Sequence, residues 1–439
     1  METNQWLKRI EDTATVKKYG KVTRIVGLMI EATGPETSIG DVCLVYTNGK
    51  SSKPIKAEVV GFQQRSVLLM PYSELKHIGP GCLVESTNQS LVVKAGNSLI
   101  GNVLNGLGEP LDGSSLPENL TYVPTDQDPP NPMERAPIRE PISIGIRAID
   151  GLLTVGKGQR IGIFAGSGVG KSTLLGMIAR NSDADINVIA LIGERGREVR
   201  EFIEKDLGDE GLKKSIVVVA TSDQPALQRI KGAYTATAIC EYFRDQGLNV
   251  NLMMDSVTRV AMAQREVGLA SGEPPTTKGY TPSVFATLPK LLERTGANNR
   301  GSITAFYTVL VDGDDMNEPV ADAVRGTLDG HFVLDRSIAE QGRYPAVSIL
   351  KSISRVMQNI SSREHLQAAE YIRNILATYE ENKELIQIGA YKKGASREVD
   401  QAISFYPQIV KYLKQDVHEN VTGGEGIQML LELANGSEQ

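Results

Sequence analysis

Short runs of residues typical of β-strands occupy the first part of the chain. The runs span Lys21–Glu31, Asp41–Tyr46, Ile55–Val60 and Arg65–Met70. Gly and Pro residues separate them, as at Gly34-Pro35. Short strand patterns at close spacing, with turn residues between them, are typical of a small β-barrel. We therefore predict a β-barrel domain over residues 19–88.

Runs that are almost wholly apolar occupy the middle of the chain. The five runs are Gln159–Ala165, Ile186–Ile192, Ser215–Ala220, Val250–Asp255 and Ile303–Val311. Helical spacing appears between them, for example at Lys171–Arg180 and Thr235–Gln246. Because strands that are apolar on both sides must be covered on both sides, this alternation predicts a parallel sheet between two layers of helices. We expect this α/β core over residues 89–348.

A proline-rich passage leads into this core. Its six prolines are Pro124, Pro129, Pro130, Pro132, Pro137 and Pro141. Proline fixes one backbone angle and lacks an N–H group, so this density argues against regular structure. A flexible linker is one interpretation. An ordered, extended arm is favoured because apolar residues continue through the passage.

The strand pattern stops at about residue 350, and helical spacing replaces it. The apolar positions of the two clearest helices are Tyr371, Ile372, Ile375, Leu376 and Tyr379 in one, and Ile403, Ile409, Val410 and Leu413 in the other. This spacing predicts a helical domain over residues 349–439.

Composition and charge narrow the functional classes. The 439 residues are 41% hydrophobic and 23% charged, which is ordinary for a globular chain with large cores. A formal net charge of −6 counts against a protein whose main task is to grip nucleic acid. Three scattered cysteines fit neither a disulfide framework nor a zinc site. No stretch approaches the roughly 20 apolar residues that span a bilayer, and the N-terminus is polar, so we expect a cytoplasmic protein.

The strongest chemical signal is the stretch from Ala165 to Thr173, between a predicted strand and a predicted helix. Glycines there let successive backbone N–H groups turn toward one anion, and the helix N-terminus adds more. Lys171 would pair with the β- and γ-phosphates of ATP, and the Ser172 hydroxyl would ligate Mg²⁺. Ala165 stands where the usual pattern has glycine. The predicted ATP-binding residues are Gly166, Ser167, Gly168, Val169, Gly170, Lys171, Ser172 and Thr173.

Two acidic residues follow neighbouring apolar runs. Asp255 closes one run, which places a carboxylate at the carboxyl edge of the sheet, where it would hold the Mg²⁺ shell. Glu194 comes two residues after Ile192 and could orient the attacking water. From spacing alone, a solvated loop acid in a charged stretch is an equal alternative for Glu194. Arg355 and Tyr344 carry no local signal, and a surface arginine and a packed tyrosine are the simpler interpretations.

Long stretches of the chain nevertheless resemble a known family. They include Arg147–Leu153, Gly279–Arg294 and Asp314–Pro319. These stretches are similar to the rotary-type ATPases related to the catalytic subunit of the F1 ATP synthase. The closest resemblance is to the flagellar protein-export ATPases and the ATPases of type III secretion systems. The stretch Ile388–Ser396 lacks the acidic run of the synthase subunit and is similar to the export type, and Thr276-Thr277-Lys278 favours the flagellar branch.

The resemblance implies a barrel, a RecA-like nucleotide-binding domain and a helical domain, assembled as a homohexamer that hydrolyses Mg-ATP. It implies that Glu194 is the catalytic glutamate and that Arg195 beside it supports the phosphate site. It further implies that Arg355 reaches the γ-phosphate held by a neighbouring subunit, and that Tyr344 packs on adenine.

The resemblance also implies partners and a place in the cell. The partners are export chaperones with their substrates and an export gate, so the protein would lie against the inner face of the cytoplasmic membrane. A stalk-like regulatory protein would bind the N-terminal segment, residues 1–18. There Trp6, Leu7 and Ile10 form either an apolar face for a partner helix or part of a frayed terminus. We expect no nucleic-acid partner.

Three alternatives remain. A nucleotide-binding regulatory subunit of a synthase would lack the acid found at Glu194. A hexameric RNA translocase would need a basic surface and aromatic–basic clusters in the barrel, which this acidic chain does not show. A virulence-type secretion ATPase is not separated from the flagellar type by these residues.

Overall fold

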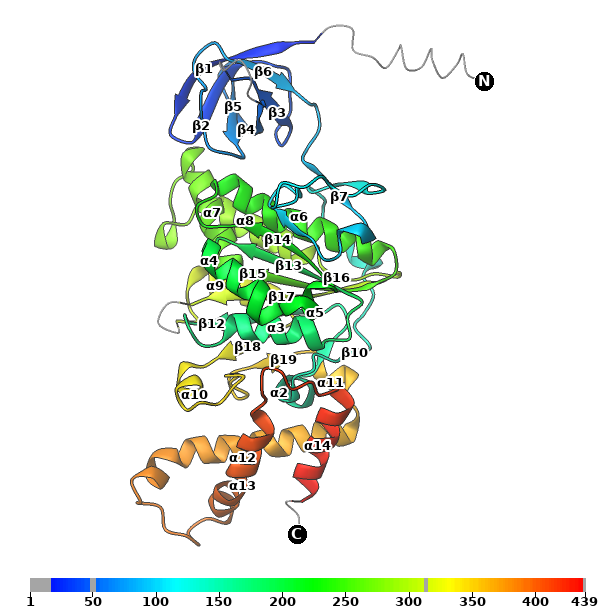
Figure 1. Ribbon diagram of the computed structural model, residues 1–439. Coiled ribbons are helices and arrows are strands. Elements are labelled where there is room, and N and C mark those ends of the chain that lie inside the picture. Colours follow the sequence, from blue (N-terminus) through cyan, green and yellow to red (C-terminus); the bar gives the residue numbers. More distant parts are fainter. Residues whose placement is uncertain (1–16, 48–52, 312–314, 437–439) are drawn as a thin grey trace.

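The computed structural model describes residues 17–47, 53–311 and 315–436, which form three stacked parts (Figure 1). A closed barrel lies at one end, an α/β core in the middle and a group of helices at the other end. This is the architecture that the sequence predicted. Trp6, Leu7 and Ile10, and Asp314 of one family-like stretch, lie outside the described residues.

The barrel closes in the strand order β1-β2-β5-β4-β3-β6. Its strands are β1 (Tyr19–Val26), β2 (Met29–Thr33), β3 (Val42–Val45), β4 (Ile55–Gln63), β5 (Ser66–Pro71) and β6 (Leu83–Ser86). The single strand predicted at Lys21–Glu31 is wrong. Gly27 adopts φ +57° and turns the chain there, so the run is an antiparallel hairpin of β1 and β2. The pattern also missed β6.

The proline-rich passage is ordered, but it does contain short regular elements, so the expectation of none is wrong. These are β9 (Thr121–Pro124), which pairs with β7 (Val92–Ala95), the 3-10 turn η2 (Pro132–Glu134), and β10 (Pro141–Ile142), which pairs with β11 (Val155–Gly156). Proline stands at the end of each element: Pro124 closes β9, Pro132 opens η2 and Pro141 opens β10. At such positions the missing N–H interrupts a ladder least.

The central sheet has the strand order β19-β18-β12-β17-β15-β13-β14-β8, with β16 beside β17. Its strands are β8 (Val103–Asn105), β12 (Arg160–Ala165), β13 (Ile186–Ile192), β14 (Ser215–Ala220), β15 (Asn249–Asp255), β16 (Gly296–Ala297), β17 (Ser302–Leu310), β18 (Gly330–Leu334) and β19 (Ile353–Ser354). From β18 to β8 all neighbours are parallel, whereas β19 and β16 pair antiparallel. The five predicted runs match five of these strands to within one residue at each end.

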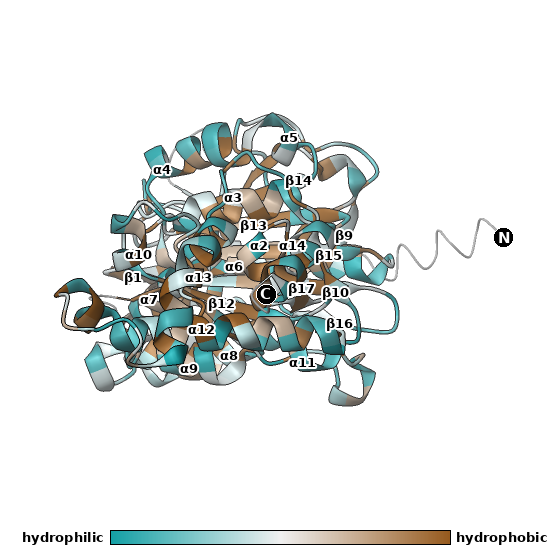
Figure 2. Ribbon diagram, turned by 90° about the horizontal axis from the view of Figure 1, so that it is seen from below, coloured by the Kyte–Doolittle hydropathy of each residue, from teal (hydrophilic) through white to brown (hydrophobic). Residues whose placement is uncertain are grey.

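Helices cover both faces of the sheet. The elements of the core are η1 (Asn97–Leu99), α2 (Arg147–Leu152), α3 (Lys171–Asn181), α4 (Gly196–Glu201), η3 (Phe202–Leu207), α5 (Gly208–Leu212), α6 (Ala226–Asp245), α7 (Val257–Ala270), η4 (Thr277–Gly279), α8 (Pro282–Glu293), α9 (Pro319–Thr327) and α10 (Arg336–Glu340). Side chains alternate along each strand. Ile189 and Leu191 of β13 pack in the cluster that holds α2 and α3, whereas Val188 and Ala190 pack with α6 to α9. Figure 2 shows hydrophilic residues on the outer turns of α4 and α5.

The C-terminal part packs against α2. Its helices are α11 (Met357–Ile360), α12 (Arg363–Gln387), α13 (Arg397–Leu413) and α14 (Gly423–Asn435). The two predicted helices correspond to α12 and α13, and α14 was missed. Tyr412 of α13 donates to the carbonyl oxygens of Arg147 and Gly426, each at 3.0 Å, which ties α13 to both α2 and α14. None of the described helices has the length and apolar character that crossing a bilayer requires.

Candidate functional site

The loop between β12 and α3 has the backbone that an anion site requires. It leaves the carboxyl end of β12 at Ala165, and α3 begins at Lys171 with Gly170 as its N-cap. Gly170 adopts φ +93°, which a residue with a Cβ rarely adopts. The first N–H groups of α3 have no partner within the helix, and they are directed toward this loop.

Charged residues from three strands of the sheet meet at the mouth of this loop. Lys171 Nζ lies 2.5 Å from Asp255 Oδ1 and 3.5 Å from Glu194 Oε1. All three side chains are largely buried: 13% of Lys171, 4% of Asp255 and 15% of Glu194 is exposed. β12, β13 and β15 are parallel, so their carboxyl ends lie at the same edge of the sheet and bring these residues together.

Burial and charge perturb this cluster. Burial disfavours the charged form of Lys171, but Asp255 and Glu194 outweigh it and raise the pKa of the ammonium group. Burial first, and then the negative charge of Asp255, raise the pKa of Glu194 to about 7, against the opposing effect of Lys171. Glu194 Oε1 is buried and has no hydrogen-bond partner in the described part of the chain, and it makes only the ion pair with Lys171. A carboxylate in this state is suited to exchange a proton near neutral pH.

The backbone around Glu194 is fixed on two sides. Gly193 adopts φ +70°, and a Cβ there would lie 2.7 Å from the Cβ of Arg259, so only glycine fits. Gly193 N donates to the carbonyl oxygen of Ala220 at 2.7 Å, and Ser222 N donates to that of Glu194 at 3.0 Å. The loop after β13 is therefore bonded to the loop after β14.

Two residues that contact the cluster were missed from the sequence. Thr308 of β17 donates a 2.8 Å hydrogen bond to Asp255 Oδ1 and holds that carboxylate in place. Arg336 of α10 donates a 3.0 Å hydrogen bond to the carbonyl oxygen of Ser167 in the loop. Thr308 lies in an apolar run beside Asp255's strand, which is a signal that could have found it, whereas Arg336 has no local signal.

Arg195 does not lie in this cluster. Its side chain is 77% exposed, and its guanidinium bonds Glu198 at 3.2 Å. In the described structure no interaction joins it to the loop. The described structure therefore shows no contact through which Arg195 would give the phosphate site the support that the resemblance implies.

Tyr344 lies beside the loop. Its ring is 3.5 Å from the position that a Cβ on Gly170 would occupy, and the side chain is 42% exposed. Together they border a pocket of about 480 Å³. Its far wall is Lys414–Val417, which follows α13, and Gln415 N donates to the carbonyl oxygen of Tyr344 at 3.0 Å. A flat group bound at the loop would enter this pocket.

The wall Lys414–Val417 is held by Arg147, which the sequence analysis quoted only as part of a family-like stretch. Its guanidinium donates to the carbonyl oxygens of Tyr412 at 3.1 Å and Lys414 at 2.6 Å, and it pairs with Glu419. Arg147 N also donates to Gln415 Oε1 at 2.9 Å. The wall could not be found from local spacing, since it lies more than 240 residues after the loop.

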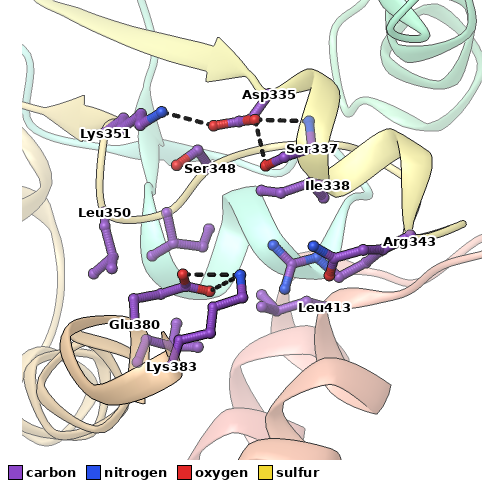
Figure 3. Close-up of a pocket in the computed structure, with 13 residues that line it drawn as sticks. Asp335, Ser337, Ile338, Arg343, Ser348, Leu350, Lys351, Glu380, Lys383 and Leu413 are labelled. Carbon is purple, nitrogen blue, oxygen red and sulfur yellow. Dashed lines mark hydrogen bonds and ion pairs between the residues drawn. The ribbon is translucent and has the colours of Figure 1, made fainter. Parts of the chain in front are cut away.

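A second, smaller hollow of about 240 Å³ lies on the other side of the same two segments (Figure 3). Arg343 and Leu413 line it, whereas their chain neighbours Tyr344 and Lys414 line the first pocket. Four of its charged residues are paired with one another: Lys351 with Asp335 and Lys383 with Glu380. It lacks the glycine loop, so the pocket at Tyr344 is the candidate for nucleotide.

Arg355 lies at the opposite edge of the sheet. Ser354 of β19 pairs with Gly330 of β18, which in turn pairs with Ile161 near the amino end of β12. Four residues of strand, about 13 Å, separate Ile161 from the end of β12 at Ala165. Arg355 is therefore an exposed residue at the edge of the sheet opposite the loop of its own chain. A head-to-tail interface joins two different surfaces of the subunit, so a residue this far from the loop of its own chain can contact a neighbouring subunit.

Three family models match successive parts of the chain. The β-barrel domain of the ATP synthase alpha/beta family matches residues 22–88. The nucleotide-binding domain of the same family matches residues 145–354, and the T3SS EscN ATPase C-terminal domain matches residues 361–432.

Individual relatives extend over nearly the whole chain. The flagellum-specific ATP synthase of Bacillus subtilis (strain 168) is 67% identical over 438 residues, 100% of both chains. The type 3 secretion system ATPase of Xanthomonas euvesicatoria is 50% identical and covers 93% of this chain and 92% of its own. The assembled ATPase EscN of enteropathogenic E. coli, solved in complex with its central stalk EscO, has a TM-score of 0.87 and 45% identity and covers 94% of this chain and 100% of its own.

Proposed function

Because the chain belongs to the ATP synthase alpha/beta family, in the branch of the flagellum-specific ATP synthases and type 3 secretion system ATPases, we propose that it is the ATPase of a flagellar protein-export apparatus. The main support for ATP hydrolysis is the buried cluster of Lys171, Asp255 and Glu194 at the mouth of the glycine loop. Identity of 67% to a flagellum-specific relative against 50% to a secretion relative favours the flagellar branch.

The residues at the loop fit Mg²⁺ bound with ATP. Mg²⁺ prefers oxygen ligands, and it usually takes one or two from protein and the rest from phosphate and water. The Ser172 hydroxyl and the Asp255 carboxylate supply oxygens of this kind, and Thr308 orients the second. When bound, the ion neutralises charge on the β- and γ-phosphates. Lys171 and the N–H groups of the loop residues Gly166–Thr173 bind the same phosphates, and Tyr344 and Lys414–Val417 enclose the base.

Hydrolysis needs a residue that positions water and a charge that stabilises the departing phosphoryl group. Glu194 takes the first role, because its ionised carboxylate can accept a hydrogen bond from water at the γ-phosphate. Arg355 takes the second role at the site of the neighbouring protomer, since it lies at the edge of the sheet opposite its own loop. The chain therefore acts as a ring of identical protomers, and the assembled state of the EscN relative supports such a ring.

Hydrolysis would release export chaperones and deliver their substrates to an export gate, with the ring held at the inner face of the cytoplasmic membrane. A stalk-like protein would regulate the ring, with the segment 1–18 as a candidate contact. The EscN relative in complex with its central stalk supports a partner of this type.

The test is the rate of ATP hydrolysis per protomer over a wide range of protein concentration, with and without EDTA, together with the assembly state by light scattering. We expect an EDTA-sensitive rate that rises with concentration as the ring forms, because each site needs a neighbour. A substantial rate from protomers that scattering shows to be monomeric would contradict the shared site. Failure to bind ATP at any concentration would contradict the assignment as an ATPase.

A further inference from the structure

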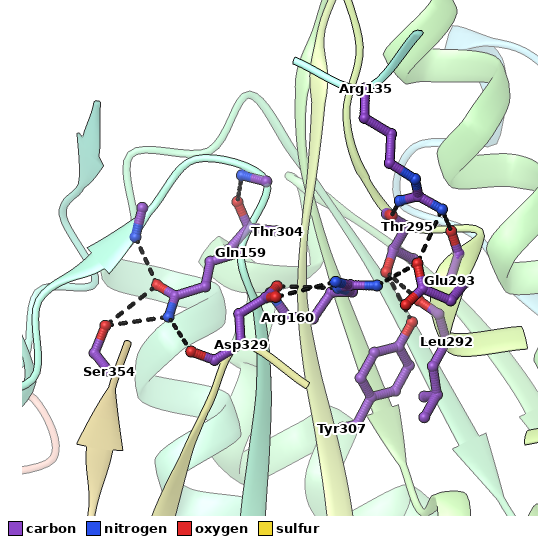
Figure 4. Close-up of polar contacts among 12 residues, drawn as sticks. Arg135, Gln159, Arg160, Leu292, Glu293, Thr295, Thr304, Tyr307, Asp329 and Ser354 are labelled. Carbon is purple, nitrogen blue, oxygen red and sulfur yellow. Dashed lines mark hydrogen bonds and ion pairs between the residues drawn. The ribbon is translucent and has the colours of Figure 1, made fainter. Parts of the chain in front are cut away.

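A polar network is built at the amino edge of the sheet, on the opposite side from the glycine loop (Figure 4). Arg160 opens β12, and its backbone N–H, Nε and Nη2 each donate a 3.0 Å hydrogen bond to the Asp329 carboxylate just before β18. Its third nitrogen pairs with Glu293 of α8 at 2.6 Å, and Arg135 pairs with the same carboxylate at 3.0 Å. The network thus joins β12, β18, α8 and the proline-rich passage.

Gln159, next to Arg160, is fully buried and bonds in three directions. Its Oε1 accepts from Gly156 N at 2.9 Å. Its Nε2 donates to the carbonyl oxygen of Asp329 at 3.2 Å and to Ser354 Oγ at 3.1 Å. Ser354 Oγ in turn donates to the carbonyl oxygen of Thr154 at 2.7 Å. A buried amide with this many partners has one orientation.

These bonds end at the residue that precedes Arg355. The side chain of Ser354 is fixed by Gln159 and Thr154, and the backbone N–H of Arg355 donates to the carbonyl oxygen of Asp329 at 3.1 Å. Asp329 itself is held at its carboxylate by Arg160. Hydrogen bonds therefore fix the backbone at Arg355, while its side chain is exposed.

We propose that Gln159, with Ser354 and Asp329, positions Arg355 for its action on the nucleotide of the neighbouring protomer. This inference rests on the proposed function, in which the Arg355 guanidinium completes the next site. A charge that stabilises a transition state is effective only when it is preorganised, and a misplacement of about 1 Å costs on the order of a hundredfold in rate. Gln159 is thus a positioning residue that acts through Arg355 and touches no substrate.

The first experiment uses the full-length chain at a concentration where light scattering shows the ring. Gln159→Leu removes the three hydrogen bonds at similar volume. We expect kcat to fall roughly 10- to 100-fold with KM for ATP unchanged within about twofold, because Arg355 contributes to the transition state and not to ATP binding. Ser354→Ala is the milder second variant, with a smaller loss of kcat in the same direction.

Thr304→Val is the matched control. Thr304 Oγ1 accepts a 2.9 Å hydrogen bond from Gly158 N, one residue before Gln159, and none of its described bonds leads to Arg355. The substitution strips a buried N–H group of its partner in the same region, so it reproduces a structural defect without the positioning defect. We expect a lowered Tm with kcat near that of the unaltered chain.

The decisive measurement is made on mixed rings, because a merely structural defect in a protomer's own site is not repaired by its neighbour. Gln159→Leu and Glu194→Gln chains carry different tags, are produced together and are isolated through both tags. A site between the two kinds of chain can combine the intact Glu194 of a Gln159→Leu protomer with the well-placed Arg355 of a Glu194→Gln neighbour. Hydrolysis should return at such a site. With random mixing about one quarter of the sites are of this kind. The same mixture made with Arg355→Ala in place of Gln159→Leu is the reference.

The outcomes separate the two proposals. Wild-type kcat in rings of both Gln159→Leu and Ser354→Ala would overturn the positioning role. So would recovery of activity in the Arg355→Ala mixture without recovery in the Gln159→Leu mixture, since the defect would then lie in the variant's own site. A failure of the Arg355→Ala mixture itself would overturn the shared site, and the positioning role with it.

Discussion

The two edges of the central sheet differ in how their charges are matched. At the carboxyl edge Lys171 lies between Asp255 and Glu194, and Glu194 Oε1 is buried without a hydrogen-bond partner in the described chain. At the amino edge two cations, Arg160 and Arg135, are matched by two carboxylates, those of Asp329 and Glu293, although Arg160 Nη1, like Glu194 Oε1, makes an ion pair without a hydrogen bond. Strand β12 spans both edges, with Arg160 at one end and the glycine loop after the other.

The difference indicates two functions for one strand. A carboxylate with a buried oxygen that lacks a hydrogen-bond partner, and with a raised pKa, is costly for the folded chain and useful for binding and proton exchange. A network in which each charge has a partner of opposite sign is suited to holding a neighbouring residue still. If Arg355 acts on the next protomer of a ring, as proposed, the amino edge of one protomer meets the carboxyl edge of its neighbour, and a rigid edge meets a reactive one.

The largest effect should come from Arg355→Ala. Loss of an arginine that stabilises the transferred phosphoryl group costs about 10³-fold or more in kcat, and ATP binding should persist. Rates of hydrolysis and the Kd of a fluorescent ATP analogue, measured on the assembled ring, check this. Arg325→Ala is the control, because Arg325 is a half-buried arginine on α9 that pairs with Asp322. If the Arg355→Ala ring hydrolyses ATP normally, the amino edge of the sheet contributes no catalytic charge, and the proposed difference in function between the two edges is wrong.

Glu194→Gln should lower kcat by about 10²–10⁴-fold while ATP binding is kept, because the amide cannot accept a proton from water but preserves shape. The same two assays apply. Glu201→Gln, at an exposed position in the mixed-charge stretch of α4, should have no effect. Near-normal turnover of Glu194→Gln would remove the carboxylate from the mechanism and leave the loop as a binding site only.

Arg147→Ala should raise KM for ATP about tenfold, with a smaller change in kcat. The substitution frees the carbonyl oxygens of Tyr412 and Lys414 and so loosens the wall of the base pocket. Steady-state kinetics with ATP and GTP would also show reduced discrimination between bases. Arg373→Ala is the matched control, since Arg373 of α12 donates to Leu152 and contacts α2 away from the wall. An equal rise in KM for the control would mean that α2 packing alone is responsible.

The smallest effect concerns pH. Burial and Asp255 raise the pKa of Glu194 to about 7, and the carboxylate is active only when ionised, so kcat/KM should rise as pH increases through this range. A hydrogen bond and the charge of Glu198 add to the shift, so Glu198→Gln should move the rise to lower pH. A pH profile of kcat/KM that is flat between 6 and 8 (about one unit either side of 7) would contradict the ionisation of Glu194 in this range.

The elements of the fold were predictable where one pattern decided them. The buried strands β12, β13, β14, β15 and β17 are apolar on both sides and so stood out. The β1–β2 hairpin did not, because a single glycine turn lies inside a continuous apolar run. β19 was also not predictable. It has only two residues, too few to show a periodic pattern, and its place in the sheet depends on pairing with β18.

The site was predictable where chemistry is local. The glycine loop, Asp255 and Glu194 each sit at the end of an apolar run, so their meeting at one edge follows from a parallel sheet. The wall Lys414–Val417 and the support of Arg355 by Gln159 depend on contacts across about 200 residues or more of sequence, which spacing does not encode. Arg355 and Tyr344 could be assigned only through the resemblance to a family.

The most direct test of the account is the ATPase activity of rings mixed from Arg355→Ala and Glu194→Gln chains, each inactive alone. If the two edges act in different sites, an Arg355→Ala site beside a Glu194→Gln protomer is complete, and about one quarter of the sites should recover activity under random mixing. If the mixed rings form and remain as inactive as their parents, each protomer uses both residues in one site, and the division between the edges of the sheet is wrong.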